Sequence, residues 1–460
     1  MGICGTGVGA LAGMLQAQGY RITGSDQEVY PPMSDFLASL GIEVKSGYRP
    51  ENLAHRPDLV IVGNVITRIN PEAEALAAQR IPYLSMPQAL GQFFLTGKES
   101  LVVSGTHGKT TTSSLLATML HYLERDPGFM IGGLVQEFGR NFNIGQGPYF
   151  VVEGDEYDTA FFDKGPKFLH YQPQIAIITS IEFDHADIYA DLEAVKRSFR
   201  KLVAILPAHG TLIANLDDPV VAEVCQGAVC PVLGYGEGRG LAWTLTDLDV
   251  QADGTSFTAL KDGALFGRFK SRMPGRHNAM NTLAVTAVLA RIGFAAAEIA
   301  HHLPRFPGVR RRQEVRGEVR GITVIDDFAH HPTAVRETLA ALRSAYPARR
   351  LVAIFEPRTN SSRRRVFQED YVLVFDQADE ILIKEPQPLA TLAEEMRFSG
   401  LQLSRDLEAR GRRATCFTDT DAIIALLART AKSGDVIAIM SNGGFDNIHS
   451  RLLQALANPV

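Results

Sequence analysis

Short apolar runs, each long enough for one buried strand, recur along the chain and alternate with helix-like stretches. They include residues 59–62, 101–103, 175–178, 324–325, 351–354 and 436–439. Several of these runs are followed directly by Gly or Asn and then by a helical pattern. This rhythm is typical of βαβ units, which form parallel sheets that bind ligands at the carboxyl ends of their strands. The sequence therefore predicts an α/β fold.

The length and the charge of the chain limit its organisation and its partners. Its 460 residues are enough for about three domains. The formal net charge of −5 argues against a protein that coats nucleic acid or anionic lipid. No apolar run approaches the roughly 18 residues of a membrane span. The four cysteines form no CxxC pair, which argues against a zinc knuckle or a disulfide framework. We expect a cytoplasmic protein, monomeric or weakly homo-oligomeric, with neither nucleic acid nor membrane as a partner.

Two breaks in the pattern mark the expected domain boundaries. Residues 92–100 interrupt it before a new strand and glycine loop, and residues 303–308 form a linker rich in Pro and Gly. We predict three domains, each built on a mainly parallel sheet flanked by helices, at residues 1–96, 97–306 and 307–460.

The strongest chemical signal is the segment 101–112, in which an apolar strand runs into Ser-Gly-Thr-His-Gly-Lys-Thr-Thr-Thr and then into a helix expected to start near Ser113. Backbone N–H groups of such a loop close around phosphate oxygens. Lys109 can reach the β- and γ-phosphates, and the Thr110 hydroxyl can ligate Mg²⁺. Val103 stands where the full P-loop pattern has its first glycine. The segment nevertheless predicts an ATP site that includes Gly105, Thr106, His107, Gly108, Lys109, Thr110 and Thr111.

Two polar segments follow later strands. Glu153 ends one apolar run and opens Glu-Gly-Asp-Glu-Tyr-Asp, and His185 follows another run within Glu-Phe-Asp-His-Ala-Asp. Either segment alone is an ordinary polar loop. At consecutive strand ends after a P-loop, they predict a Mg²⁺ site made by Thr110, Glu153 and His185.

Three further groups lie toward the C-terminus. Asn278, at the start of an apolar helix, can either cap that helix or contact a nucleotide, and the sequence leaves both open. Arg312 ends a row of three arginines just past the second linker. Such a row is often a solvated face, but here a domain can bring a guanidinium onto a transferring phosphoryl group. His330 and His331 lack zinc spacing, so substrate binding or proton transfer is the expected role of His330.

The N-terminus carries a second glycine pattern. Residues 5–10 fit G-x-G-x-x-[GA], and Ser25 and Asp26 follow about twenty residues later, as in a dinucleotide fingerprint. Only Met1 stands before Gly2, so either the native start lies upstream or this sheet lacks most of its first strand. Alone, this pattern fits an NAD-dependent dehydrogenase, and the P-loop-like segment argues against that alternative.

Six motifs, in this order, resemble the Mur ligase family over essentially the whole chain: GTHGKTTT, VVEGDEYD, SIEFDHAD, PGRHNAMNT, GVRRRQE and DDFAHHPT. The resemblance implies a Rossmann-like, UDP-binding N-domain, a P-loop ATPase middle domain and a mobile, Rossmann-like C-domain. It also implies that ATP drives the joining of a carboxylate to an amine. Many relatives have a carbamylated lysine near the place where Phe199 stands, so we assign none here.

The resemblance assigns roles to individual residues. It implies a phosphate-binding Lys109, the metal ligands Thr110, Glu153 and His185, a nucleotide-contacting Asn278, and an Arg312 near the phosphates. The expected catalytic set is Lys109, Arg312 and His330. The expected contacts to the UDP-sugar are Gly5, Thr6, Gly7, Ser25 and Asp26. A nucleotide-binding regulator without catalytic activity is the remaining alternative, and the presence of all these residues argues against it.

Several segments, among them GSDQEVYPPMS, FEPRTNSS and MSNGGFDNIH, are more similar to the branch of the family that acts in cell-wall recycling. That resemblance implies joining of UDP-N-acetylmuramate to the tripeptide L-alanyl-γ-D-glutamyl-meso-diaminopimelate. The alternative is the branch that adds L-alanine to the same sugar nucleotide. Arg358, Asn360 and Asn442 are the expected acceptor contacts, because several fixed donors suit the more anionic tripeptide.

Overall fold

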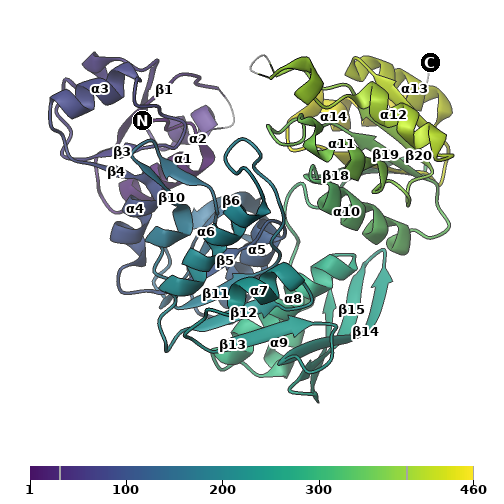
Figure 1. Ribbon diagram of the computed structural model, residues 1–460, viewed down its shortest axis with the longest axis horizontal. Helices are drawn as coiled ribbons and strands as arrows, with labels where there is room; N and C mark the ends of the chain where they lie inside the picture. The colour runs from purple at the N-terminus through teal and green to yellow at the C-terminus, as the bar shows by residue number, and fades with distance from the viewer. Residues whose placement is uncertain (31–32, 390–391, 459–460) are drawn as a thin grey trace. The chain divides into compact units, whose positions relative to one another are not determined.

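The computed structural model describes residues 1–30, 33–389 and 392–458, and the chain divides into two compact units (Figure 1). The first unit comprises Met1–Glu182, Leu192–Trp243 and Ala284–His302, and the second comprises Phe183–Asp191, Thr244–Leu283 and Leu303–Val460. The chain thus contributes several separate segments to each unit, and the two are described one at a time. Among the described residues, no helix is both long and apolar enough to cross a bilayer.

The N-terminal part of the first unit pairs its strands two by two. Strand β1 runs parallel to β2, and β3 runs parallel to β4. Residues 1–3 form no strand, but they are bonded to both pairs: the Met1 amino group donates to Ile61 O (2.8 Å), and Gly2 N donates to Ser25 O (2.8 Å). This short segment therefore connects the two strand pairs. The elements are α1 (Thr6–Ala17), β1 (Thr23–Asp26), α2 (Met33–Ser39), β2 (Glu43–Ser46), β3 (Val60–Val62), α3 (Pro71–Ala78), β4 (Tyr83–Ser85) and α4 (Met86–Leu90).

The centre of the first unit is a mainly parallel sheet with the strand order β13-β12-β11-β5-β8-β6-β7, in which only β6 and β7 are antiparallel neighbours. Its middle strand β5 is buried from Ser100 to Ser104, as expected for a parallel strand covered on both faces. The strands are β5 (Glu99–Ser104), β6 (Gly128–Val135), β7 (Arg140–Asn143), β8 (Tyr149–Gly154), β11 (Ile175–Ile178), β12 (Thr211–Asn215) and β13 (Val232–Gly236), with a hairpin of β9 (Asp158–Ala160) and β10 (Asp163–Pro166). The helices are α5 (Lys109–Tyr122), α6 (Leu192–Ile205), α7 (Pro219–Cys225), α8 (Arg276–Arg291), whose first half belongs to the second unit, and α9 (Ala296–His302).

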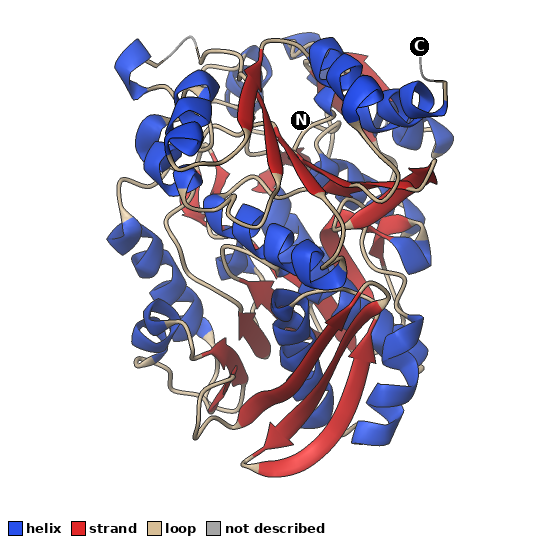
Figure 2. Ribbon diagram, turned by 90° about the vertical axis from the view of Figure 1, so that its right-hand side faces the viewer, coloured by secondary structure: helices blue, strands red, loops and turns tan. Residues whose placement is uncertain are grey.

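The second unit contains a six-stranded sheet with the order β17-β18-β22-β19-β20-β21. Only the edge strand β17 is antiparallel to its neighbour. The strands are β17 (Glu314–Val319), β18 (Ile322–Asp327), β19 (Leu351–Phe355), β20 (Glu380–Lys384), β21 (Ala414–Phe417) and β22 (Val436–Met440). The helices are α10 (Pro332–Ala345), α11 (Gln368–Val372), α12 (Gly400–Ala409), α13 (Thr420–Thr430) and α14 (Ile448–Ala457). Three further strands of this unit, β14 (Trp243–Gln251), β15 (Gly254–Lys261) and β16 (Ala264–Ser271), are the long ones in the lower part of Figure 2.

Two apolar cores cover the two faces of the six-stranded sheet. Ala353 and Phe355 of β19 pack into one core with α10, α11 and α12, whereas Val352 and Ile354 pack into the other with α13 and α14. A strand with apolar residues at successive positions can bury both of its faces only in such a three-layer arrangement. The predicted α/β fold class is therefore confirmed. The predicted boundaries at residues 96/97 and 306/307 stay predictions.

Candidate functional site

The glycine loop lies at the carboxyl end of β5 and leads directly into α5. The helix begins at Lys109, so the expected start near Ser113 is wrong by four residues. A run of Thr and Ser has low intrinsic helix propensity, which explains the later start expected from the sequence. Within the helix, Ser113 Oγ donates to Lys109 O (2.5 Å), one turn earlier. Lys109 and Thr110 are therefore on the first turn of a helix, where N–H groups have no acceptor within the helix and can point to a ligand.

Two glycines of this loop have backbone conformations that other residues rarely adopt. Gly105 has φ 136°, and a Cβ atom there would lie 2.1 Å from Thr179 Oγ1. Gly108 has φ 80° and precedes α5. Hydrogen bonds from Thr106 N to Ser180 O (2.9 Å) and from Thr179 Oγ1 to His107 O (2.5 Å) tie the loop to the segment after β11. The loop is thus held by the neighbouring strand end.

The Lys109 ammonium group lies among buried acceptors. Its Nζ donates to Gly105 O (2.6 Å) and forms an ion pair with Glu156 Oε2 (3.1 Å); 14% of the Lys109 side chain and 2% of the Glu156 side chain are exposed. Burial alone lowers the pKa of Lys109, but the carboxylates of Glu156 and Asp155 outweigh burial and raise it above its usual value. The lysine therefore remains charged at neutral pH. Within the run Glu-Gly-Asp-Glu-Tyr-Asp, the sequence gives no sign that Glu156 is the partner of Lys109.

Glu153, near the end of β8, and Asp155, just after it, have opposite electrostatic surroundings. Burial raises the pKa of Glu153, the charge of Asp155 adds to this, and hydrogen bonds from Gly132 N (2.9 Å) and the Thr110 side chain act against it. Burial also acts to raise the pKa of Asp155, but Lys167 (3.0 Å) and Lys109 reverse the effect and lower it. Thr110 and Glu153, two of the three expected metal ligands, are therefore in contact within the first unit.

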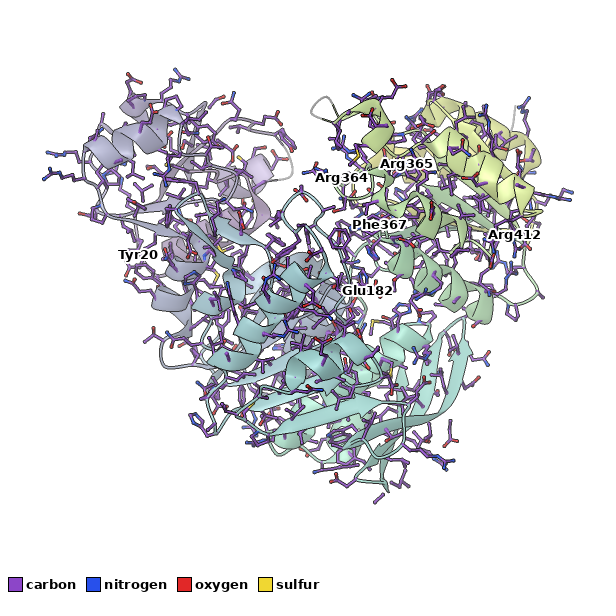
Figure 3. The ribbon with its side chains drawn as sticks, viewed as in Figure 1. Tyr20, Glu182, Arg364, Arg365, Phe367 and Arg412 are labelled. Carbon is purple, nitrogen blue, oxygen red and sulfur yellow. The ribbon has the colours of Figure 1, made fainter. Side chains whose placement is uncertain are left out.

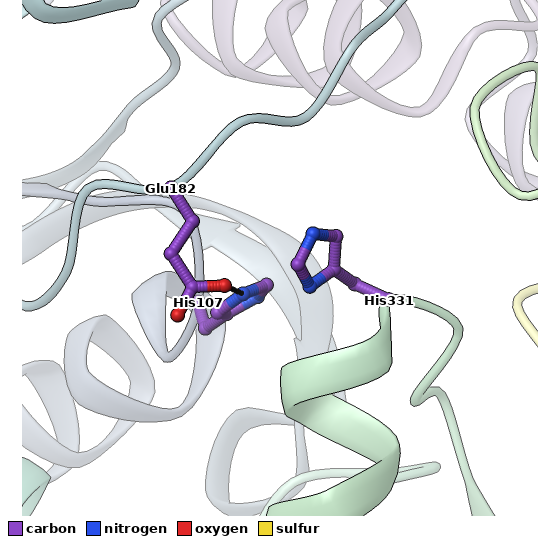
Figure 4. A group of neighbouring side chains, drawn as sticks. All are labelled: His107, Glu182 and His331. Carbon is purple, nitrogen blue, oxygen red and sulfur yellow. Dashed lines mark hydrogen bonds and ion pairs between the residues drawn. The ribbon is translucent and has the colours of Figure 1, made fainter. Parts of the chain in front are cut away.

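His107, within the glycine loop, has a carboxylate partner. Its Nε2 lies 3.1 Å from Glu182 Oε2, as Figure 4 shows. Thr106 is bound to the same residue, because Glu182 N donates to Thr106 Oγ1 (2.8 Å). Lys196, near the place of the family's carbamylated lysine, pairs with Glu193 (2.6 Å) and Glu223 (2.7 Å).

The N-terminal fingerprint is built around two carboxylates. Asp26 accepts a hydrogen bond from Cys4 N (2.8 Å), and Ser25 Oγ donates to Glu72 Oε1 (2.7 Å), whose other oxygen accepts from Asn52 (2.8 Å). Gly5 is the N-cap residue of α1, and Thr6 and Gly7 are on its first turn. Among the described residues, no side chain caps this turn. Glu72 is 3% exposed and had no sequence signal, because it follows Ser25 by 47 positions.

In the second unit, the loop 183–191 packs against residues of the C-terminal sheet. His331 caps α10 by accepting from Thr333 N (3.3 Å), and its Nε2 lies 3.2 Å from Phe183 O. Asp184 is buried, which acts to raise its pKa, but the positive charge of His185, His331 and His330 lowers it well below its usual range. The expected catalytic His330 and the expected metal ligand His185 therefore surround one buried carboxylate.

Residues of the expected acceptor site take part in the same packing. Asn360 Nδ2 donates to Asp187 Oδ2 (3.1 Å), and Ala186 N donates to Ser361 Oγ (3.2 Å). Asn360 thus holds the loop 183–191 in this structure, and its contact with an acceptor stays a prediction.

The arginine row beside β18 divides into two roles. The Arg312 guanidinium lies over the ring of Phe328, 4.8 Å from its centre. Arg311 instead binds the backbone after β22, with Nη2 donating to Ser441 O (2.6 Å) and Gly443 O (2.7 Å). Asp326 Oδ1 lies 3.5 Å from Arg311 Nε and 3.2 Å from His449 Nε2, so this carboxylate is an ion-pair partner of Arg311.

Asn278 is not a helix cap. It lies inside α8, and its amide donates to Pro274 O (2.8 Å), whereas a capping side chain accepts from helix N–H groups. The capping alternative is therefore wrong. Its neighbour His277 is half-buried. Desolvation lowers the pKa of His277 to about 4; Glu337 acts against this effect, and the charges of Arg276 and Arg312 add to it.

The segment after β22 packs tightly against the segment after β19. A Cβ atom on Gly443 would lie 2.3 Å from Arg358 Cδ and 2.5 Å from its Nη1, so the arginine lies flat against this glycine. Ser441 Oγ donates to Glu356 Oε2 (2.6 Å). Within the described residues, Asn442 Oδ1 is buried without a hydrogen-bond partner. The expected contacts Arg358 and Asn442 are therefore brought to one edge of the sheet.

Models of the Mur ligase family match three consecutive parts of the chain. Residues 1–97 match the Mur ligase family catalytic domain, residues 103–289 the Mur ligase middle domain, and residues 311–443 the Mur ligase glutamate ligase domain. These matches cover far more than half of the chain.

Named relatives match over the full length. The chain is 41% identical over 460 residues to the UDP-N-acetylmuramate–L-alanyl-γ-D-glutamyl-meso-2,6-diaminoheptandioate ligase of Escherichia coli K12, covering 99% of this chain and 97% of that one. It is 34% identical over 445 residues to the UDP-N-acetylmuramate–L-alanine ligase of Geobacter sulfurreducens, covering 96% and 94%. The crystal structure of a murein peptide ligase from Psychrobacter arcticus matches with a TM-score of 0.71 and 35% identity, covering 100% and 98%.

The geometry of Gly105 yields a stability prediction. Gly105→Ala should destabilise the protein by more than Gly97→Ala, because both positions have positive φ but only Gly105 has a neighbour, Thr179, where the Cβ atom would go. Positive φ alone costs a residue other than glycine on the order of 1–3 kcal/mol. Urea denaturation midpoints measure the difference. Equal midpoints for the two variants would contradict the tight packing of the loop against Thr179.

Proposed function

The chain belongs to the Mur ligase family, and we propose that it joins UDP-N-acetylmuramate to the tripeptide L-alanyl-γ-D-glutamyl-meso-diaminopimelate. As a family member it is an ATP-dependent ligase that forms an amide bond. The observation that carries the proposal is the full-length identity to the tripeptide ligase of E. coli, which exceeds the identity to the L-alanine ligase. We place the reaction in the cytoplasm, where ATP and sugar nucleotides are available.

The chemistry sets what the residues must do. An amine cannot expel oxide from a carboxylate, so the lactyl carboxylate of muramate first attacks the γ-phosphoryl group of ATP, giving an acyl phosphate and ADP. The peptide amine then attacks the acyl carbon, and the tetrahedral intermediate expels phosphate. We assign Lys109 and Arg312 to the negative charge of the transferring phosphoryl group, where fixed cations are most effective.

Lys109 is suited to this role by its surroundings. Its ammonium group is charged, little exposed and held at the loop by Gly105 O and Glu156. We assign the N–H groups at the start of α5, with those of Gly105 and Gly108, to the phosphates as further donors. Thr106 N and His107 N donate to Ser180 in this structure, so the ATP contacts of Thr106, His107 and Thr111 stay predictions. We assign Asn278 to the nucleotide as well. It is on the first turn of α8 and does not cap that helix, which leaves the nucleotide contact as the remaining role.

We propose that Mg²⁺ is held by Thr110, Glu153 and His185. Hydroxyl and carboxylate oxygens are the ligands that Mg²⁺ prefers. The contact between Thr110 and Glu153 supports this choice, as does the raised pKa of the partly buried Glu153 carboxyl, whose charged form a cation would favour. When bound, the ion would offset charge on the β- and γ-phosphates.

We assign the other substrates to the ends of the chain. The uncapped start of α1, with Gly5, Thr6 and Gly7, offers N–H groups to the diphosphate of the UDP-sugar, and Ser25 and Asp26 stand where the ribose is bound in such fingerprints. Arg358, Asn360 and Asn442 are assigned to the acceptor. We assign a proton transfer or substrate contact to His330, whose ring lies near buried Asp184.

The metal assignment predicts a changed Mg²⁺ requirement. Glu153→Gln keeps the size of the side chain but removes its negative charge, so half-maximal activity should need roughly tenfold or more Mg²⁺, equivalent to about 1.4 kcal/mol. The measurement is the ligation rate as a function of Mg²⁺ concentration at saturating substrates. Glu193→Gln is a control, because Glu193 pairs with Lys196 on α6. A curve for Glu153→Gln that overlays that of the parent protein would remove Glu153 from the metal site.

The acceptor assignment is tested by direct competition. Amide formation with UDP-N-acetylmuramate should be faster with the tripeptide than with free L-alanine at equal concentrations. Mass spectrometry of the product distinguishes the two acceptors in one mixture. Faster ligation of L-alanine would assign the chain to the branch of the family that adds L-alanine and leave the ligase assignment intact.

The contact between Gly443 and Arg358 predicts an effect on the acceptor alone. Gly443→Ala should raise the tripeptide KM roughly tenfold, equivalent to about 1.4 kcal/mol, because the new methyl group displaces Arg358. Gly444→Ala is the matched control, since a Cβ atom there meets nothing within 4 Å. The KM values for ATP and UDP-N-acetylmuramate should not change. Equal tripeptide KM values in the two variants would remove Arg358 from the acceptor site.

A further inference from the structure

The segment that follows β19 contains two arginines whose charges act on one another. Burial, and then the charge of Arg358, lower the pKa of Arg363. The Arg363 guanidinium is bonded to neutral oxygens: Nε to Thr359 O (3.4 Å), Nη2 to Asn360 Oδ1 (3.4 Å) and Nη1 to Gln387 O (3.5 Å). These long bonds fix the side chain but leave its charge without an opposite charge.

The carboxylates near this segment are bonded to neutral groups. Glu356 is bonded to the Ser441 hydroxyl, and Asp187 to the Asn360 amide. Across the described parts of the chain, neither Arg358 nor Arg363 has a carboxylate within ion-pair distance. The structure thus fixes both guanidinium groups within one short segment, Arg358 against Gly443 and Arg363 on the Thr359 and Asn360 oxygens, without a carboxylate among the described residues. Partly buried like charges repel one another, and a bound anion removes that cost.

The next residue adds a second observation. Arg364 Nε is buried and has no hydrogen-bond partner in the part of the chain that the structure describes. Buried guanidinium nitrogens are normally bonded, so such an atom indicates a missing partner. Arg364 lies in the same segment, beside Arg365 and Phe367 (Figure 3).

We propose that Arg358 and Arg363 together bind a carboxylate of the acceptor that lies beyond its alanyl residue. This inference rests on the proposed function and adds Arg363 as a specificity-determining residue. The γ-linkage leaves the α-carboxylate of the glutamyl residue free, and diaminopimelate brings two more carboxylates, whereas free L-alanine has none beyond its own. Guanidinium groups bind carboxylates through paired N–H donors, and two such groups at one edge of the sheet select an anionic peptide.

The variant Arg363→Gln tests the proposal, with Arg365→Gln as the matched control on a neighbouring exposed side chain. Arg363→Gln should raise the tripeptide KM roughly 10- to 100-fold, as expected when a charge-assisted contact is lost. The kcat and the KM values for ATP and UDP-N-acetylmuramate should stay near those of the parent protein, and Arg363→Lys should recover part of the loss. Arg365→Gln should behave like the parent.

Two acceptor analogues identify the carboxylate. One is the tripeptide with its glutamyl α-carboxylate converted to an amide, and the other is L-alanyl-γ-D-glutamate without diaminopimelate. The analogue that lacks the recognised group should bind the parent weakly and show little further loss with Arg363→Gln. If the substitution leaves the tripeptide KM unchanged, or raises the KM of L-alanine and of every analogue equally, the proposal is wrong. Ligation of the tripeptide by the parent protein then still supports the proposed function, and a parent that ligates only L-alanine overturns that function instead. Thermal unfolding of each variant separates loss of binding from loss of folding.

Discussion

The buried ion pair between Lys109 and Glu156 determines how the first unit can hold its phosphate loop. An isolated ammonium group in such a position would lose its proton or unfold the loop, because burial lowers its pKa. Glu156, supported by Asp155, reverses that effect. Asp155 in turn is held by Lys167, so the charges alternate in sign from the loop inward. The loop can therefore present a cation to a ligand without a ligand being needed for folding.

The second unit handles charge differently. Arg311 forms an ion pair with Asp326 and donates hydrogen bonds to the carbonyl groups of Ser441 and Gly443, so it orders the backbone after β22. Arg358 lies on that ordered backbone at Gly443, and its charge has no partner of opposite sign among the described residues. Arg311 therefore stabilises the carboxyl edge of the sheet, and Arg358 is available for a ligand.

The phosphate loop was predictable because its parts are contiguous. Strand, glycines, Lys109 and helix follow one another within a dozen residues, and each has a local conformational preference. The start of α5 was misplaced because propensity scales disfavour Thr and Ser, whereas burial of Thr111, Thr112 and Ser113 in the tertiary structure overrides that preference here.

Contacts that depend on strand order could not be read from the sequence. Arg358 meets Gly443 because β19 and β22 are neighbours, although β20 and β21 lie between them along the chain. The bond between Ser25 and Glu72 has the same origin in the N-terminal part. For Asn278, the sequence left open both a helix cap and a nucleotide contact, because capping depends on the residue at which the helix begins. The hydrogen bond from its amide to Pro274 O shows that it is not the cap.

The contrast between the two units bears on what each can bind. In the first unit, the chain supplies its own counter-charge, so a phosphate must compete with Glu156 for Lys109. In the second unit, neither Arg358 nor Arg363 has an ion-pair partner among the described residues, and Arg363 is bonded to neutral oxygens, so an anionic group gains a charge–charge interaction that a neutral one lacks. Selectivity among acceptors is therefore expected to arise from the unpaired charges, and not from the shape of the sheet edge alone. A neutral acceptor leaves the repulsion between the two guanidinium groups the same in the free and the bound protein, so it gains nothing from these charges.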